Sequence, residues 1–178
     1  MYHIKPDKRS QNSAKTICEA LANRLNHKKF EDINISEICA HCGIARTTFY
    51  RLFDTIDDIL IYQFDSLFKE AIQKSIPQES SYAKLILQLV MENQTLTSML
   101  IKSQRTDLFD FSTRLHEDTL IQNLNLNMDT KKQTYCTAML NAIVYAAIKT
   151  WMDEGKKISP DELYAILKSN IQFIGQHV

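Results

Sequence analysis

The apolar residues of this chain recur at the three- and four-residue spacing of α-helices. The first stripe comprises Ala14, Ile17, Cys18, Leu21 and Leu25. Because one side of a helix returns every 3.6 residues, this stripe predicts an amphipathic helix over residues 9–27. The same spacing predicts further helices over residues 55–75, 82–96, 97–103, 108–124, 129–154 and from 160 onward.

Two shorter helices joined by a tight turn are expected after the first helix. Asn34 followed by Glu37 is a capping-box pattern, which predicts the start of a helix. Gly43 predicts its end, because glycine accepts the positive φ of a tight turn. A second short helix is expected from about Arg46 to Phe53. This arrangement is a helix-turn-helix.

Start and stop signals also delimit the longer helices. Thr55 with Asp58 three residues on, Asp129, and Ser159 before Pro160 each predict the start of a helix. Proline lacks the N–H that a helix interior needs, so the helix that begins near Thr55 is expected to end before Pro77.

Residues that break helices are scarce in this chain of 178 residues. Three glycines and three prolines make up about 3% of it, where roughly 12% is usual. So few turn formers argue against a β-sandwich or barrel, and they exclude a glycine-rich phosphate loop. We therefore expect an all-α protein of about nine helices.

The chain shows no pattern of secretion or of membrane insertion. Its first ten residues are polar and charged, unlike a signal peptide, and no apolar run is long enough to cross a membrane. Four cysteines without a secretion signal are typical of reduced thiols. We expect a cytoplasmic protein that does not engage a membrane.

The charge is balanced overall but uneven along the chain. Lysine and arginine number 21, as do aspartate and glutamate. Residues 1–56 carry 9 basic and 6 acidic side chains, and residues 57–178 carry 12 and 15. This mild asymmetry permits nucleic-acid binding by the N-terminal part without requiring it.

The second short helix carries side chains that suit DNA. Arginine offers a bidentate fork to guanine, threonine offers a hydroxyl or a methyl group, and tyrosine and threonine hydroxyls bind phosphates. Ile44, Phe49 and Phe53 are expected to face inward. The polar side chains expected outward are Arg46, Thr47, Thr48, Tyr50 and Arg51. An ordinary helical hairpin with a polar face explains the pattern equally well.

Residues 14–60 resemble the DNA-binding domain of TetR-family transcriptional regulators. The resemblance implies that the helix from Arg46 to Leu52 enters the major groove. It implies base contacts from Arg46 and Thr47, and backbone contacts from Thr48 and Tyr50. It also implies a helix-turn-helix domain over residues 1–56 and a helical effector-binding and dimerisation domain over residues 57–178. The residues that carry it are Phe30, Ile35-Ser36-Glu37-Ile38-Cys39, Gly43-Ile44, Thr48-Phe49-Tyr50, Phe53 and Ile59-Leu60.

Three positions depart from the family pattern. Ala45 stands where serine or threonine would cap the recognition helix, a cap worth about 1 kcal/mol. Ile56 stands where the family usually has a lysine that reaches a phosphate. Cysteines occupy two sites in the first helix of the motif where alanines are common. Further candidates for DNA contacts are Lys28, Lys29, Arg51 and Asn34.

The segment Cys39-Ala40-His41-Cys42 supplies at most three metal ligands. Small buried thiols in place of alanines are the favoured interpretation, with thiol redox sensing and metal binding left open. No arrangement of residues typical of a catalytic site is present. We expect no enzyme activity, no cofactor and no metal.

The C-terminal part resembles a TetR-family subgroup that includes the activator of a dihydroxyacetone kinase operon. The residues that carry this resemblance lie between Asn141 and Leu167. It implies that the effector is either a small molecule or a partner protein. Candidate lining residues of an effector pocket are His116, Tyr135, Tyr145 and Trp151, although core packing is the commoner role of such aromatics.

Small residues four apart on one helix indicate a close helix–helix contact. With an apolar stripe on the last helix they predict a two-fold, four-helix dimer interface. Packing inside one chain is the alternative for each stripe. The residues are Ala138, Ala142 and Ala146 on one helix, and Leu163, Leu167 and Ile171 on the last.

The sequence thus predicts a homodimeric regulator that binds a double-stranded DNA operator and responds to an effector. The alternative is a protein-interaction module with a TetR-like fold that has lost operator binding. The missing lysine at Ile56 and the neutral net charge favour that alternative.

Overall fold

The computed structural model describes residues 1–78, 82–116 and 129–177. Over these ranges the chain forms nine α-helices, one short 3-10 turn and no strand, which confirms the all-α prediction. Packing divides the chain into two compact units. Unit 1 comprises Met1–Ser66 and Gln94–Leu115, and unit 2 comprises Leu67–Asn93 and His116–Val178. The functional boundary between residues 56 and 57 stays a prediction.

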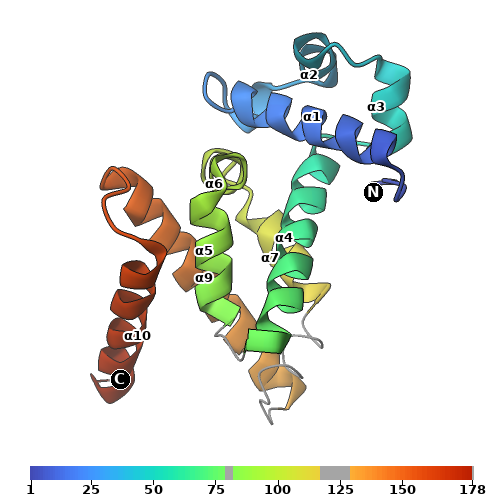
Figure 1. Ribbon diagram of the computed structural model, residues 1–178. Helices are drawn as coiled ribbons and strands as arrows, with labels where there is room; N and C mark the ends of the chain where they lie inside the picture. Colours follow the sequence, from blue (N-terminus) through green and yellow to red (C-terminus); the bar gives the residue numbers. More distant parts are fainter. Residues whose placement is uncertain (79–81, 117–128, 178) are drawn as a thin grey trace. The chain divides into compact units, whose positions relative to one another are not determined.

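Unit 1 is built around its first helix, which packs against α2, α3 and α6. Figure 1 shows α2 and α3 on one side of α1. Helix α4 begins in unit 1 and ends in unit 2. The elements are α1 (Lys8–Arg24), η1 (Phe30–Asp32), α2 (Ile35–Cys42), α3 (Arg46–Leu52), α4 (Asp57–Gln78), α6 (Gln94–Lys102) and α7 (Thr106–Arg114).

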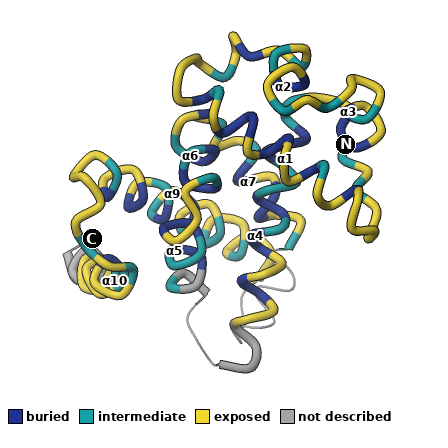
Figure 2. The backbone as a smooth tube through the Cα atoms, turned by 45° about the horizontal axis from the view of Figure 1, so that its top comes forward, coloured by how far each residue is buried: buried dark blue, intermediate teal, exposed yellow. Residues whose placement is uncertain are grey.

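The core of unit 1 is apolar and rich in aromatic rings. The ring centroids of Phe49 and Phe53 are 5.9 Å apart, and Phe53 is also 5.9 Å from Tyr62. Figure 2 shows buried and exposed stretches alternating along α1. Phe49 and Phe53 are fully buried as predicted, whereas Ile44 is only half-buried. Leu52, which was not expected in the core, is buried beside them.

Local capping sets the bounds of the short helices. The Asn34 side chain accepts the N–H of Glu37 at 3.0 Å, and Gly43 ends α2 with φ at +67°. Thr55 and Asp58 cap α4 reciprocally, since each side chain accepts the backbone N–H of the other, at 3.4 and 2.9 Å. These caps confirm the predicted starts and the predicted turn.

Unit 2 holds the end of α4 with α5 (Tyr82–Glu92), α9 (Thr130–Asp153) and α10 (Pro160–His177). Helix α5 packs against both α9 and α10. Asp129 caps α9, and Ser159 and Glu162 cap α10 reciprocally, as predicted. None of the described helices combines the length and apolarity needed to cross a membrane.

Several predicted helix bounds differ from those of the structure, which has α1 end at Arg24 and α6 begin at Gln94. Residues 82–96 do not form one helix, because the chain leaves the helix at Asn93, a residue whose side chain competes for backbone hydrogen bonds. Helix α4 continues through Pro77 to Gln78, because a proline in the last turn costs few helical bonds. Helix α7 ends at Arg114, and residues 117–124 of the predicted helix lie outside the described residues.

Candidate DNA-binding interface

Helix α3 separates a polar face from a buried one. Phe49 and Leu52 are buried, which fixes the helix against α1. The polar side chains predicted to contact DNA lie on the other side, where Thr48 is half-buried and four are exposed: Arg46, Thr47, Tyr50 and Arg51. Ala45 at its start offers no side-chain acceptor, as the sequence indicates. DNA contact by these residues stays a prediction.

Arg46 and Tyr50 form a pair one helical turn apart on this face. A hydrogen bond with the Tyr50 side chain raises the pKa of Arg46. The Tyr50 ring stacks edge-on against Phe49 with centroids 5.6 Å apart, which anchors an otherwise half-exposed side chain. Arg46 itself is exposed, so its guanidinium is accessible for a fork to a base edge.

The other predicted DNA contacts differ in availability. Lys28 donates to Glu37 at 2.7 Å, and this ion pair lowers the pKa of Glu37. The carbonyl oxygen of the Asn34 side chain is occupied as the α2 cap. Lys29 and Arg51 are exposed. Two of the four candidates thus already have structural partners.

The two cysteines of α2 are buried or half-buried, whereas Ala40 and His41 between them are exposed. Cys39 is buried, which raises the pKa of its thiol, and Cys42 directs its thiol to the Cys39 carbonyl at 3.7 Å. His41 turns its Nδ1 towards Arg24 Nη2 on α1, at 2.8 Å. In the parts of the chain that the structure describes, no group of three His, Cys, Asp or Glu side chains converges. These contacts support packing as the role of the two thiols.

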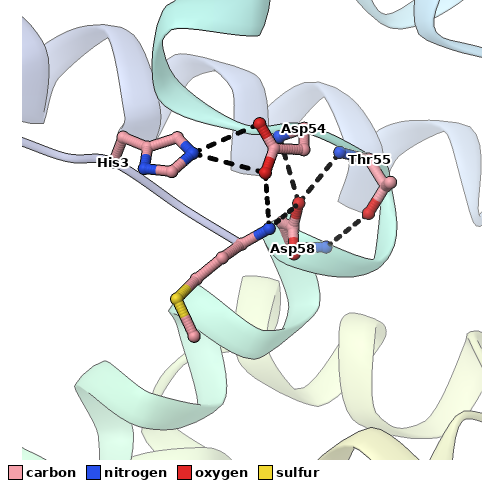
Figure 3. A network of polar contacts seen from close by, with 5 residues as sticks. His3, Asp54, Thr55 and Asp58 are labelled. Atoms are coloured by element: carbon pink, nitrogen blue, oxygen red, sulfur yellow. Dashed lines mark hydrogen bonds and ion pairs between the residues drawn. The ribbon is translucent and has the colours of Figure 1, made fainter.

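The first residues of the chain fold back onto the junction between α3 and α4 (Figure 3). The His3 N–H donates to the Leu52 carbonyl at 2.8 Å. The Met1 ammonium contacts Asp54 at 2.7 Å and the buried Asp58 at 3.0 Å. His3 Nε2 lies 3.2 Å from Asp54, and these contacts lower the pKa of Asp54. Sequence reasoning missed this attachment, because no local pattern pairs residues so far apart.

Arg105 is a second feature that the sequence did not disclose. Its guanidinium forks to both carboxylate oxygens of Asp57, at 2.7 and 3.1 Å. It also contacts Asp107 at 2.9 Å and lies over the Phe30 ring, 5.4 Å from the centroid. The start of α7 is thereby tied to the start of α4 and to η1 within unit 1.

Three solved structures resemble this chain, and two of them are described as transcriptional regulators. Lin0861 from Listeria innocua matches with a TM-score of 0.75 at 17% identity, over 97% of this chain and 96% of that chain. FadR from Bacillus subtilis, solved in complex with stearoyl-CoA, matches with a TM-score of 0.61 at 17% identity, over 86% of this chain and 95% of that chain. A TetR transcriptional regulator from Rhodococcus sp. RHA1 matches with a TM-score of 0.54 at 15% identity, over 89% of this chain and 94% of that chain.

The chain has the fold of TetR-type regulators. No protein-family model matches the chain, and no curated protein matches it in sequence. At these identities the likeness establishes the fold and leaves the function to the residues themselves.

Within this TetR-like fold, the predicted pocket residues differ in burial, and their role in binding an effector stays a prediction. Trp151 is buried and its indole N–H donates to the Ile158 carbonyl at 2.9 Å, so it closes the turn between α9 and α10. Tyr135 is 64% exposed on α9. At about 100° per residue, Tyr135 and Trp151 face nearly opposite sides of that helix. Tyr145 is half-buried, and the half-buried His116 ring lies 6.3 Å from Phe68.

The predicted dimer residues divide into exposed and buried sets. Leu163 is buried within its own chain, and its part in a dimer contact stays a prediction. Leu167 is half-buried. The residues that remain exposed are Ala138, Ala142 and Ala146 on α9 and Ile171 on α10.

Proposed function

We propose that this chain is a sequence-specific, DNA-binding transcriptional regulator of the TetR type. The observation that carries the proposal is the two-sided helix α3. Its buried Phe49 and Leu52 fix it in unit 1, while Arg46, Thr47 and Tyr50 are exposed on the opposite face. An arginine and a threonine on a rigid short helix are the side chains that read base edges in the major groove.

In the proposed complex α3 enters the major groove of a double-stranded operator. Arg46 forks to a guanine, with Thr47 beside it on a neighbouring base. Thr48 and Tyr50 bind phosphates through their hydroxyls, which sets the depth and register of the helix.

The regulator is proposed to act as a cytoplasmic homodimer. Two α3 helices need to lie about 34 Å apart to enter successive major grooves on one face of DNA. The face of α9 that carries Ala142 also exposes Tyr135 and Met139, at 64% and 63%. On α10, Ile166 and Ile171 are 47% and 45% exposed. Apolar and small residues on two adjacent helices support a two-fold contact there.

The effector is proposed to act on unit 2. A small molecule and a partner protein are the two classes that the sequence leaves open. The structural similarity to a FadR solved with stearoyl-CoA makes a long-chain acyl-CoA the first small molecule to test. If the effector is a partner protein, that protein should be retained on a column that carries this chain. If it is a small molecule, adding it should raise the melting temperature of this chain.

Selection of duplexes from a random pool tests the DNA proposal. We expect wild-type protein to enrich a palindromic site with two half-sites about one helical turn apart. Arg46→Ala should lose about 1–3 kcal/mol of discrimination at one position of each half-site. Tyr50→Phe should weaken binding to all sequences about equally.

Two results would contradict the proposal. Failure of the wild type to enrich any sequence would favour the alternative, a protein-interaction module that has lost operator binding. A uniform loss for Arg46→Ala across all single-base variants would remove the base-contact role of that residue while leaving DNA binding in place.

A further inference from the structure

A basic surface pocket lies beside the last turn of α3 in unit 1. Its volume is about 160 Å³, several times the roughly 30 Å³ that one water occupies in the liquid. The pocket brings together the first residues of the chain, the start of α1 and the end of α3. Its polar lining comprises His3, Lys5, Asp7, Arg9, Ser10 and Arg51.

Three cations of this pocket, Lys5, Arg9 and Arg51, differ in their pairing from other cations of unit 1. Elsewhere in unit 1, Lys28 is paired with Glu37 and Arg105 with Asp57. Among the residues that the structure describes, Lys5, Arg9 and Arg51 form no ion pair. Three positive charges that line one pocket and are not ion-paired give it a positive potential, so the pocket favours an anion.

The one acidic residue of the lining is already occupied. Asp7 accepts the N–H of Ser10 at 2.9 Å as the cap of α1, and this bond lowers its pKa. Asp7 therefore stays ionised, but its charge serves the helix start. Counting Asp7 against Lys5, Arg9 and Arg51 leaves two net positive charges before His3 is considered.

The shape of the pocket depends on contacts that fix its walls. The His3 N–H donates to the Leu52 carbonyl at 2.8 Å, and Tyr2 pairs with Phe53 in an antiparallel bridge. These bonds hold the segment that carries Lys5 against the end of α3. The cations are thus placed together by the backbone before any ligand arrives.

We propose that this pocket binds a phosphate of the DNA backbone at the edge of the groove that α3 enters. The inference rests on the proposed function and extends it to Lys5 and Arg9, which no sequence pattern marked. Helix α3 has seven residues and is about 10 Å long, close to the ~12 Å width of the major groove. The end of α3 that carries Arg51 therefore comes within reach of the phosphates bordering the groove.

The test is a double-mutant cycle in which charges of the pocket and charges of the DNA phosphates are removed separately and together. The protein variants are Lys5→Gln and Arg9→Gln, singly and together, with Lys132→Gln as the matched control because its side chain is 75% exposed on α9. The DNA is a duplex enriched by wild-type protein, in which single phosphates are replaced in turn by neutral methylphosphonates. Affinity is measured over a range of salt concentrations.

We expect one phosphate per half-site at which the methylphosphonate weakens wild-type binding about tenfold and weakens the double variant no further. The slope of log K against log salt should fall in magnitude by about 0.9 for each phosphate that the variant no longer neutralises, with base preference unchanged. Arg9→Lys should recover most of the slope. Lys132→Gln should match the wild type, and thermal melts confirm that each variant is folded.

Equal losses for wild type and double variant at every phosphate would overturn this inference while the proposed function stands. Occupation of the pocket by millimolar inorganic phosphate, without coupling to any duplex phosphate, would assign it to a free anion and also overturn the inference. If wild-type protein enriches no duplex, the proposed function fails and the inference fails with it.

Discussion

Replacing Arg105 tests whether its contacts stabilise unit 1. Arg105→Gln removes two charge-assisted bonds to Asp57, two to the more exposed Asp107, and the cation–π interaction with Phe30. Such bonds contribute about 1.5–3 kcal/mol when shielded and about 0.2–1 kcal/mol when exposed. The Arg105 side chain is 28% exposed and that of Asp57 41%, so an intermediate value applies. With about 0.5–1 kcal/mol for the ring interaction, we expect a loss of about 2 kcal/mol.

Urea unfolding of the full chain measures this loss. Arg105→Lys keeps the charge but not the fork, so about half of the loss is expected. Lys149→Gln is the matched control, because Lys149 pairs with Asp153 on one exposed helix face, where such pairs contribute less than about 0.5 kcal/mol. A double-mutant cycle with Asp57→Asn should give a coupling of about 1 kcal/mol.

The acid dependence of stability supplies a second measurement. Arg105 lowers the pKa of Asp107. A carboxyl with a lowered folded-state pKa stabilises the fold above its unfolded pKa of about 4, and this contribution is lost as pH falls through the folded pKa. Arg105→Gln should therefore flatten the loss of stability below about pH 4. The stabilising role of Arg105 is refuted if Arg105→Gln lowers the free energy of unfolding no more than Lys149→Gln does and leaves its pH dependence in acid unchanged.

Three further predictions concern other parts of the chain. Gly43→Ala should cost about 1–2 kcal/mol of unfolding free energy, because φ is +67° while a Cβ would meet nothing within 4 Å; no loss in urea unfolding would contradict this. Ala142→Glu should convert the proposed dimer to a monomer, as measured by sedimentation. The dimer proposal is wrong if the wild type itself sediments as a 20.6 kDa monomer at micromolar concentration. Asp54→Asn should make stability less sensitive to acid, since the lowered pKa of Asp54 stabilises above about pH 4 and that contribution is lost below it; an unchanged melting profile at low pH would show that its contacts contribute nothing.

Local chemistry explains which parts of the fold the sequence could predict. The helix caps involve residues no more than four positions apart in the sequence, so they follow from spacing alone. Examples are Asn34, Gly43 and the Thr55–Asp58 pair. The exposed face of α3 follows from the same local periodicity. The helix-turn-helix was therefore within reach of sequence reasoning.

Contacts between distant segments were out of reach for a physical reason. Arg105 and Asp57 are 48 residues apart, and nothing in either neighbourhood selects the other. On α10, Leu163 is buried while Ile166 is exposed, and the helix packs against both α5 and α9. Periodicity locates an apolar stripe but not its partner.

The anchoring of α3 links these distant contacts to the proposed function. A helix of seven residues is too short to be stable alone, so its position depends on what packs against it. Phe49 holds its middle in the core, and the bond from His3 to the Leu52 carbonyl holds its end. Weakening either anchor displaces every polar side chain of the helix together. Such variants should lower affinity for all sequences alike, whereas only substitutions on the exposed face, at Arg46 or Thr47, should change which sequence is preferred.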